Sequence, residues 1–224
     1  MQIPKSTSIK ICGITNTDQA KAIAKMKVNA IGVIGVESSK RFVKESQRRE
    51  IFHELSRQFP EIKRVWVVAN MNEQDLSRGL MGKGIPNIIQ LHGEESEEKC
   101  RSLRKAHPQF QWWKAIRIKT QKDLQKALGY SGKVDELLLD AWSSSSLGGT
   151  GHQIPLDWLK DFRIENPWWL AGGISAKCIS EILQKIKPWG VDASSKLEIF
   201  PGIKDLNKVK LLVETIRSHN QTDI

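Results

Sequence analysis

The chain alternates between short apolar, β-rich runs and longer amphipathic stretches, and this alternation limits the fold more than any other feature. The expected strands cover residues 8–12, 30–36, 65–69, 87–91, 111–116, 136–140, 168–171 and 190–193. Helical patterns follow at residues 18–26, 44–58, 73–82, 94–106, 121–128, 156–162, 176–186 and, after 205, to about 217. Ser175 and Asp205 could cap the last two of these helices. Eight strand–helix repeats in 224 residues predict an α/β protein with a single (β/α)8 TIM barrel.

A doubly wound open sheet would show the same alternation, so the pattern favours the barrel without excluding that fold. Both folds bury their parallel strands on two faces, as the three consecutive leucines at 137–139 suggest. No break in composition and no Pro/Gly-rich linker divides the sequence. We therefore expect one domain over residues 1–224, with its core at about 8–217.

The formal net charge is +10, which leaves several kinds of partner open. A basic surface can attract nucleic acid, a membrane or an anionic substrate, or it can simply reflect a basic proteome. The 35 Lys and Arg residues are dispersed along the chain, without a dense block. This dispersion favours an ordinary basic surface, and it predicts that the protein binds neither nucleic acid nor membranes.

The three cysteines, Cys12, Cys100 and Cys178, are too few and too irregularly spaced for a disulfide framework or a zinc site. Such usage is typical of a reducing cytosol. The first ten residues lack the apolar core of a signal peptide, and no apolar run approaches the ~20 residues that a membrane helix needs. We expect a soluble, cytoplasmic protein without a bound metal.

Polar residues gather where the predicted strands end, which is where a β/α barrel carries its chemistry. Gly and Ser pairs after the seventh and eighth strands predict a phosphate site, because backbone N–H groups of such turns can face an anion. Each pair alone would be an ordinary turn. The candidate site residues are Cys12, Arg41, Gln90, His92, Asp140, Gly172, Gly173, Asp192, Ser194 and Ser195.

Two of these residues could take part in proton transfer. Asp140 directly follows the apolar run at 137–139, where a buried acid needs a partner or a raised pKa. Its alternative role is a helix cap or turn residue. Cys12 precedes Gly13 at a strand end and could act as a base in a positive field, although most lone cysteines are inert core residues.

Other notable residues suit structural roles better. We expect His92 to be a hydrogen-bonded wall residue, and Cys100 and Cys178 to pack inside helices. The tandem tryptophans at 112–113 and 168–169 must point to opposite faces of their strands, so one ring of each pair should lie outside the barrel interior. Residues 143–151, SSSSLGGTG, could form a linker or a lid over a substrate.

Six short motifs occur in an order that resembles the phosphoribosylanthranilate isomerases. They are KICGIT, AIGVIGVESSKRFV, IIQLHGEE, LLLDA with GGTG, LAGGI and VDASSKLEIFPGIKD, and they extend from about Ser8 to Arg217. Each motif is weak alone, but their shared order and spacing make a specific signal.

The resemblance implies an Amadori rearrangement in tryptophan biosynthesis. The substrate would be N-(5-phosphoribosyl)anthranilate and the product 1-(2-carboxyphenylamino)-1-deoxyribulose 5-phosphate, with no metal or organic cofactor and a monomeric or homodimeric enzyme. By the same resemblance, Cys12 is the general base, Asp140 the general acid, and Arg41 faces the anthranilate carboxylate. The phosphate-binding turns would be Gly172–Gly173 and Ser194–Ser195.

Three features depart from that family's usual pattern. Lys40 stands where the family has proline, which could loosen the loop that holds Arg41. Lys196 stands where the family has glycine, so it would be strained if its φ were positive, or it could add charge beside a phosphate. Trp142 and the serine run make the loop after the sixth strand unusual.

Two other functions remain as alternatives. A related phosphate-binding barrel such as indole-3-glycerol-phosphate synthase would need a lysine acid in the barrel mouth, where this chain offers Cys12. A basic barrel that binds nucleic acid without catalysis would need basic and aromatic residues clustered on one face. The dispersed charges do not favour it.

Overall fold

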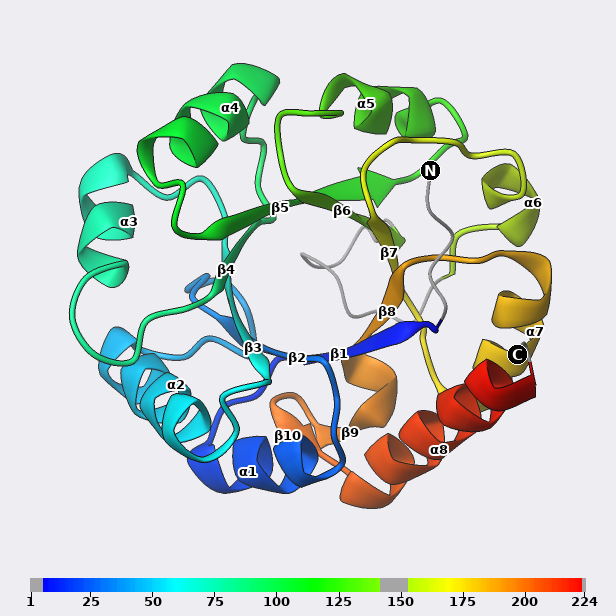
Figure 1. Cartoon of the computed structure of the whole chain (residues 1–224), viewed down its shortest axis with the longest axis horizontal. Helices are drawn as coiled ribbons and strands as arrows, with labels where there is room; N and C mark the ends of the chain where they lie inside the picture. Colours follow the sequence, from blue (N-terminus) through cyan, green and yellow to red (C-terminus); the bar gives the residue numbers. More distant parts are fainter. Residues whose placement is uncertain (1–5, 142–152, 223–224) are drawn as a thin grey trace.

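A computed structural model describes residues 6–141 and 153–222 of the chain. Eight parallel strands follow one another in sequence order around a closed barrel, and helices surround it (Figure 1). The barrel closes where β1 pairs with β8, with Lys10 opposite Asp192. The (β/α)8 prediction is therefore confirmed, and the open-sheet alternative is wrong.

The elements agree with the predicted order, with small shifts at their ends. The strands are β1 (Ser8–Cys12), β2 (Ala30–Ile34), β3 (Lys63–Val68), β4 (Ile88–Leu91), β5 (Gln111–Ile118), β6 (Glu136–Ala141), β7 (Trp168–Ala171) and β8 (Gly190–Ala193). The helices are α1 (Thr17–Lys25), α2 (Glu45–Gln58), α3 (Glu73–Gly79), α4 (Glu97–Ala106), α5 (Asp123–Gly129), α6 (Leu156–Leu159), α7 (Ala176–Lys185) and α8 (Leu206–Thr222).

Side chains alternate between two apolar layers, as the two-residue period of a strand requires. Trp112 and Trp168 belong to the large core between the strands and the outer helices. Their neighbours Trp113 and Trp169 pack inside the barrel, with ring centroids 4.8 Å apart. The prediction for the tandem tryptophans is confirmed, since one ring of each pair lies outside the barrel interior.

Helix caps test the local predictions. Asp205 caps α8, because its carboxylate accepts from the backbone N–H of Asn207 at 3.0 Å. Ser175 occupies the N-cap position of α7 but makes no capping hydrogen bond with its side chain. Its hydroxyl instead lies 3.5 Å from Cys178 Sγ, so the expected side-chain cap is wrong.

A small antiparallel hairpin, which the strand pattern did not predict, follows β8. A 3-10 turn (Ser195–Leu197) leads into β9 (Glu198–Phe200) and β10 (Ile203–Lys204), beside α1 and α8 (Figure 1). Its strands are only three and two residues long. The hairpin matters because it places Glu198 and Lys204 beside the barrel mouth. Within the described residues, no helix is long and apolar enough to span a membrane.

Candidate active site

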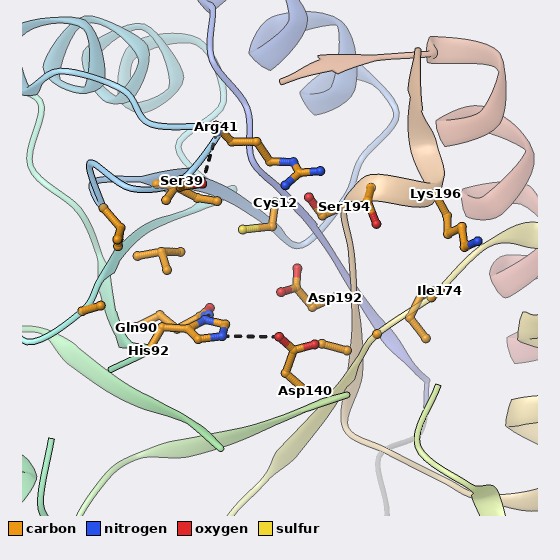
Figure 2. Close-up of a pocket in the computed structure, with 18 residues that line it drawn as sticks. Cys12, Ser39, Arg41, Gln90, His92, Asp140, Ile174, Asp192, Ser194 and Lys196 are labelled. Atoms are coloured by element: carbon orange, nitrogen blue, oxygen red, sulfur yellow. Dashed lines mark hydrogen bonds and ion pairs between the residues drawn. The ribbon is translucent and has the colours of Figure 1, made fainter. Parts of the chain in front are cut away.

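One cavity at the carboxyl ends of the strands contains every residue that the sequence singled out for the site. Figure 2 shows Cys12 and Asp140 on opposite sides of this cavity, with Asp192 between them in the view. The lining includes Cys12, Arg41, Gln90, His92, Asp140, Gly172, Gly173, Asp192, Ser194 and Ser195. Their convergence follows from the barrel, which brings all strand ends to one face.

Asp140 is a buried strand residue and not a cap or turn residue, so that alternative is wrong. It lies within β6 and is 5% exposed. His92 Nε2 lies 3.3 Å from Asp140 Oδ2. Nε2 nevertheless makes no well-aligned hydrogen bond, so the two groups are in close polar contact only.

Gln90 fixes the orientation of the His92 ring. The Gln90 side-chain amide donates to His92 Nδ1 at 3.0 Å. Because Nδ1 accepts that bond, a neutral ring carries its proton on Nε2, the nitrogen that faces Asp140. His92 is thus a hydrogen-bonded wall residue, as expected, and it presents an N–H toward the carboxyl group of Asp140.

Cys12 lies at the end of β1 beside a buried ion pair. Lys10 Nζ and Asp192 Oδ2 are 2.8 Å apart, and both side chains are buried. Burial raises the pKa of the Cys12 thiol, while the Lys10 ammonium opposes that rise. The second carboxylate oxygen of Asp192, Oδ1, is buried without a hydrogen-bond partner and leaves an acceptor in the cavity wall.

Arg41, in the loop after β2, is fixed from two directions. Its backbone N–H donates to Ser39 Oγ at 3.1 Å, and its guanidinium donates twice to Glu198. Burial raises the pKa of Glu198, but the contacts with Arg41 and Lys204 outweigh it and hold that pKa below its usual value. Lys40 therefore does not prevent the loop from presenting Arg41 to the cavity.

The turns after β7 and β8 form one wall of the cavity. Gly172 and Gly173 have φ values of 95° and 68°, a conformation that favours glycine. Ser194 and Ser195 also belong to the lining, followed by exposed Lys196. Lys196 belongs to the 3-10 turn and its φ is not positive, so the condition for backbone strain at this lysine is not met.

Sequence reasoning missed three charged groups behind the cavity: Lys10, Glu198 and Lys204. Lys204 Nζ donates to Glu198 Oε1 at 2.8 Å and to Ser194 O at 3.2 Å. The signal for Lys10 was present, because a lysine two residues before Cys12 must face the same side of the strand. Glu198 and Lys204 gave no such signal, since the hairpin brings them to the site.

Comparisons with known proteins identify the family of this chain. The sequence profile of the N-(5'phosphoribosyl)anthranilate (PRA) isomerase family matches residues 9–215. The chain belongs to the PRA isomerase family. One relative, N-(5'-phosphoribosyl)anthranilate isomerase of Thermosynechococcus vestitus, is 39% identical over 96% of this chain and 91% of its own. The tryptophan-pathway reaction implied by the motifs is consistent with this membership.

Solved PRA isomerases have the same fold. The Thermotoga maritima enzyme superposes with a TM-score of 0.82 at 28% identity, covering 95% of this chain and 99% of its own. A second PRA isomerase structure, at TM-score 0.76 and 28% identity over 95% and 99% of the two chains, holds reduced 1-(o-carboxyphenylamino)-1-deoxyribulose 5-phosphate.

The described part of the chain contains no cluster of three or more His, Cys, Asp or Glu side chains that could hold a metal ion. Trp142, the serine run and the GGTG motif, which were expected to form a lid or a linker, lie outside the described residues.

Proposed function

We propose that this chain converts N-(5-phosphoribosyl)anthranilate into 1-(2-carboxyphenylamino)-1-deoxyribulose 5-phosphate, with Asp140 as general acid and Cys12 as general base. The supporting observation is the placement of one carboxyl and one thiol on β6 and β1, across a single cavity, in a member of this family. An acid and a base on different sides of a ribose are what this rearrangement requires.

The acid acts first. Asp140 donates its proton to the furanose ring oxygen, the bond between that oxygen and C1 breaks, and the anilino nitrogen supplies the electron pair that forms the Schiff base. His92 Nε2, 3.3 Å from Asp140 Oδ2, faces the carboxylate that this step leaves behind. An N–H in that position favours the ionised product of the transfer.

The base acts second. Cys12, as a thiolate, removes the proton from C2 of the sugar, and the electron pair moves toward the protonated imine. The substrate's own imine accepts these electrons, so no external cofactor is required. The resulting enolamine takes up a proton at C1 and loses the proton of the C2 hydroxyl, which gives the aminoketone.

The remaining cavity residues suit the other parts of the substrate. Arg41 offers a guanidinium for the anthranilate carboxylate, since planar guanidinium groups match carboxylates well. Asp192 Oδ1, which is buried without a partner, can accept a ribose hydroxyl. The Gly172–Gly173 and Ser194–Ser195 turns are suited to the phosphate through their backbone N–H groups.

The ligand held by the related PRA isomerase supports this assignment, because it is a reduced form of the proposed product. We further propose that each chain carries a complete site, because all lining residues come from one barrel, which fits a monomer or a homodimer. The three unpaired cysteines support a cytoplasmic location. We do not expect nucleic acid among its partners.

The decisive experiment follows the fluorescence of phosphoribosylanthranilate, which decays as the rearrangement proceeds. We expect decay with the purified protein and almost none with Cys12→Ser or Asp140→Asn. Persistent fluorescence with the wild-type protein would refute the proposed function. Duplex-DNA binding at several salt concentrations tests the alternative, since binding to a phosphate backbone weakens steeply as salt rises.

A further inference from the structure

Lys10 is a buried lysine inside the barrel, directly beneath the proposed base. It lies two residues before Cys12 on β1, so both side chains point to the barrel interior, while Ile9 and Ile11 pack into the outer core. Its relative exposure is 0%. A charged group at such a position needs a counterion, because burial of an isolated ammonium costs free energy.

Asp192 supplies the partner for Lys10. The two residues are register neighbours on adjacent strands β1 and β8, and Nζ lies 2.8 Å from Oδ2. Burial by itself lowers the pKa of Lys10, but the charges of Asp192 and Cys12 outweigh burial and raise it. The side chain therefore remains an ammonium over the whole pH range in which the enzyme would work.

Gly32 on β2 shows how closely the ammonium and the thiol approach each other. A Cβ built on Gly32 would lie 2.7 Å from Cys12 Sγ and 3.2 Å from Lys10 Nζ. Gly32 is the register partner of Cys12, so the missing side chain leaves the space in which sulfur and ammonium face each other. Any larger residue there would displace one of the two groups.

We propose that Lys10 is a positioning residue that favours the thiolate form of Cys12, the form able to accept a proton from the substrate. The inference rests on the proposed role of Cys12 as base. A neighbouring lysine is a known means of stabilising a thiolate. Asp192 then has a second effect, since it holds Lys10 in place but partly offsets its positive charge.

Other charged groups around the barrel mouth also act on the Cys12 thiol, so they contribute to the pH dependence of its ionisation. The groups that face it are Arg41 after β2, His92 after β4, Asp140 on β6, Asp192 on β8 and Lys204 on β10. Lys204 and Arg41 share Glu198 as their counterion, which reduces their influence on the sulfur. Lys10 is paired with a carboxylate too, but it lies two residues from Cys12 on the same strand and faces the same side.

The test measures the reactivity of Cys12 without any substrate. The protein is labelled with iodoacetamide between pH 5 and 10, and mass spectrometry follows the peptide that contains Cys12. Lys10→Met should label roughly tenfold or more slowly than wild type at pH 7, because each unit of pKa changes the thiolate fraction about tenfold. At high pH the two rates should converge, which shows that access to the sulfur is unchanged.

Lys114 provides the matched control. Its ammonium is also buried, pairs with Glu95 at 2.8 Å, and lies on β5 away from the cavity lining. Lys114→Met should therefore label Cys12 like wild type, even if it lowers stability by a similar amount. An unchanged labelling midpoint in Lys10→Met would overturn the proposal.

A second variant keeps the test informative if circular dichroism shows that Lys10→Met does not fold. Lys10→Gln removes the ammonium but keeps a hydrogen-bond donor for Asp192, so its Cys12 labelling curve should move to higher pH. A curve that stays in place or moves to lower pH would contradict the proposal. The labelling needs no turnover. Absence of isomerase activity in the wild type would therefore overturn the proposed function, while the effect of Lys10 on Cys12 could still be measured.

Discussion

Arg41 and Glu198 are 157 residues apart in sequence and form a two-point ion pair, with Nε–Oε1 at 2.7 Å and Nη2–Oε2 at 2.6 Å. The pair joins the loop after β2 to the hairpin after β8, across the proposed phosphate side of the cavity. It holds the guanidinium plane in one orientation, and Nη1 takes no part in this pair. A ligand carboxylate would thus meet a cation that is already positioned.

Arg41→Lys should raise KM for phosphoribosylanthranilate roughly tenfold and change kcat by less than about threefold. Lysine keeps the charge but loses the planar two-point geometry, and a carboxylate remote from the reacting bonds is bound alike in the ground and transition states. Steady-state kinetics measures both values. Arg64→Lys, at a half-buried arginine outside the cavity lining, is the control and should leave KM unchanged. A large fall in kcat alone in Arg41→Lys would contradict this role.

Asp140→Asn and Cys12→Ala should each lower kcat by at least ~10², since general acids and bases typically supply factors of 10² to 10⁴. KM should change little, because neither group is proposed to hold the phosphate or the anthranilate. Cys100→Ala removes another buried thiol, from α4, and serves as the control. If either site variant retained near wild-type kcat, the proposed division of roles would be wrong.

The barrel and the contents of its mouth were predictable because both depend on local patterns. Strand ends such as Cys12 and Asp140 could be located from apolar periodicity, and barrel topology then brings those ends to one face. Arg41 was placed in the correct loop on the same grounds. No contact between distant segments was needed for any of these assignments.

The charged residues behind the cavity could not be predicted in the same way. Glu198 lies in a three-residue strand, too short to give a periodic signal, and its pairing with Arg41 depends on how the hairpin folds back. Lys10 was visible as a lysine in an apolar strand, but its counterion Asp192 is 182 residues away. Partner choice at such separations is set by three-dimensional packing and not by local sequence.

Lys196→Ala should raise KM about two- to fivefold at low ionic strength and have little effect at moderate salt, because an exposed ammonium contributes weakly and is readily screened. Lys196 lies in the lining next to Ser195, which places a cation near the proposed phosphate. Its backbone is unstrained, so neither Lys196→Ala nor Lys196→Gly should raise the melting temperature. Kinetics at two salt concentrations tests the charge, and an unchanged KM at low salt would exclude a role in phosphate binding.

Glu136 should make the stability of the barrel depend on pH. It begins β6 at the opposite mouth of the barrel, where it accepts a hydrogen bond from Trp169 Nε1. Burial raises the pKa of Glu136 to about 7, and the hydrogen bond from Trp169 only partly opposes that rise. An acid whose pKa is higher in the folded state binds more protons there than in the unfolded chain. The contribution of Glu136 to the free energy of unfolding is therefore largest below about pH 4.5, and it is lost as the pH rises through about 7.

Glu136→Gln removes this titration while keeping an acceptor for Trp169. Its free energy of unfolding should nearly equal that of wild type at pH 5 and exceed it by roughly 2 kcal/mol at pH 8, given about 1.4 kcal/mol per unit of pKa shift and partial solvent screening. Urea denaturation at the two pH values measures the difference, and the comparison between variants cancels the contribution of other titrating groups. Glu61→Gln, an exposed acid at the same mouth, should show no such pH-dependent gain. Equal stabilities of wild type and Glu136→Gln at pH 8 would mean that Glu136 ionises there without cost and that its burial does not govern the pH dependence.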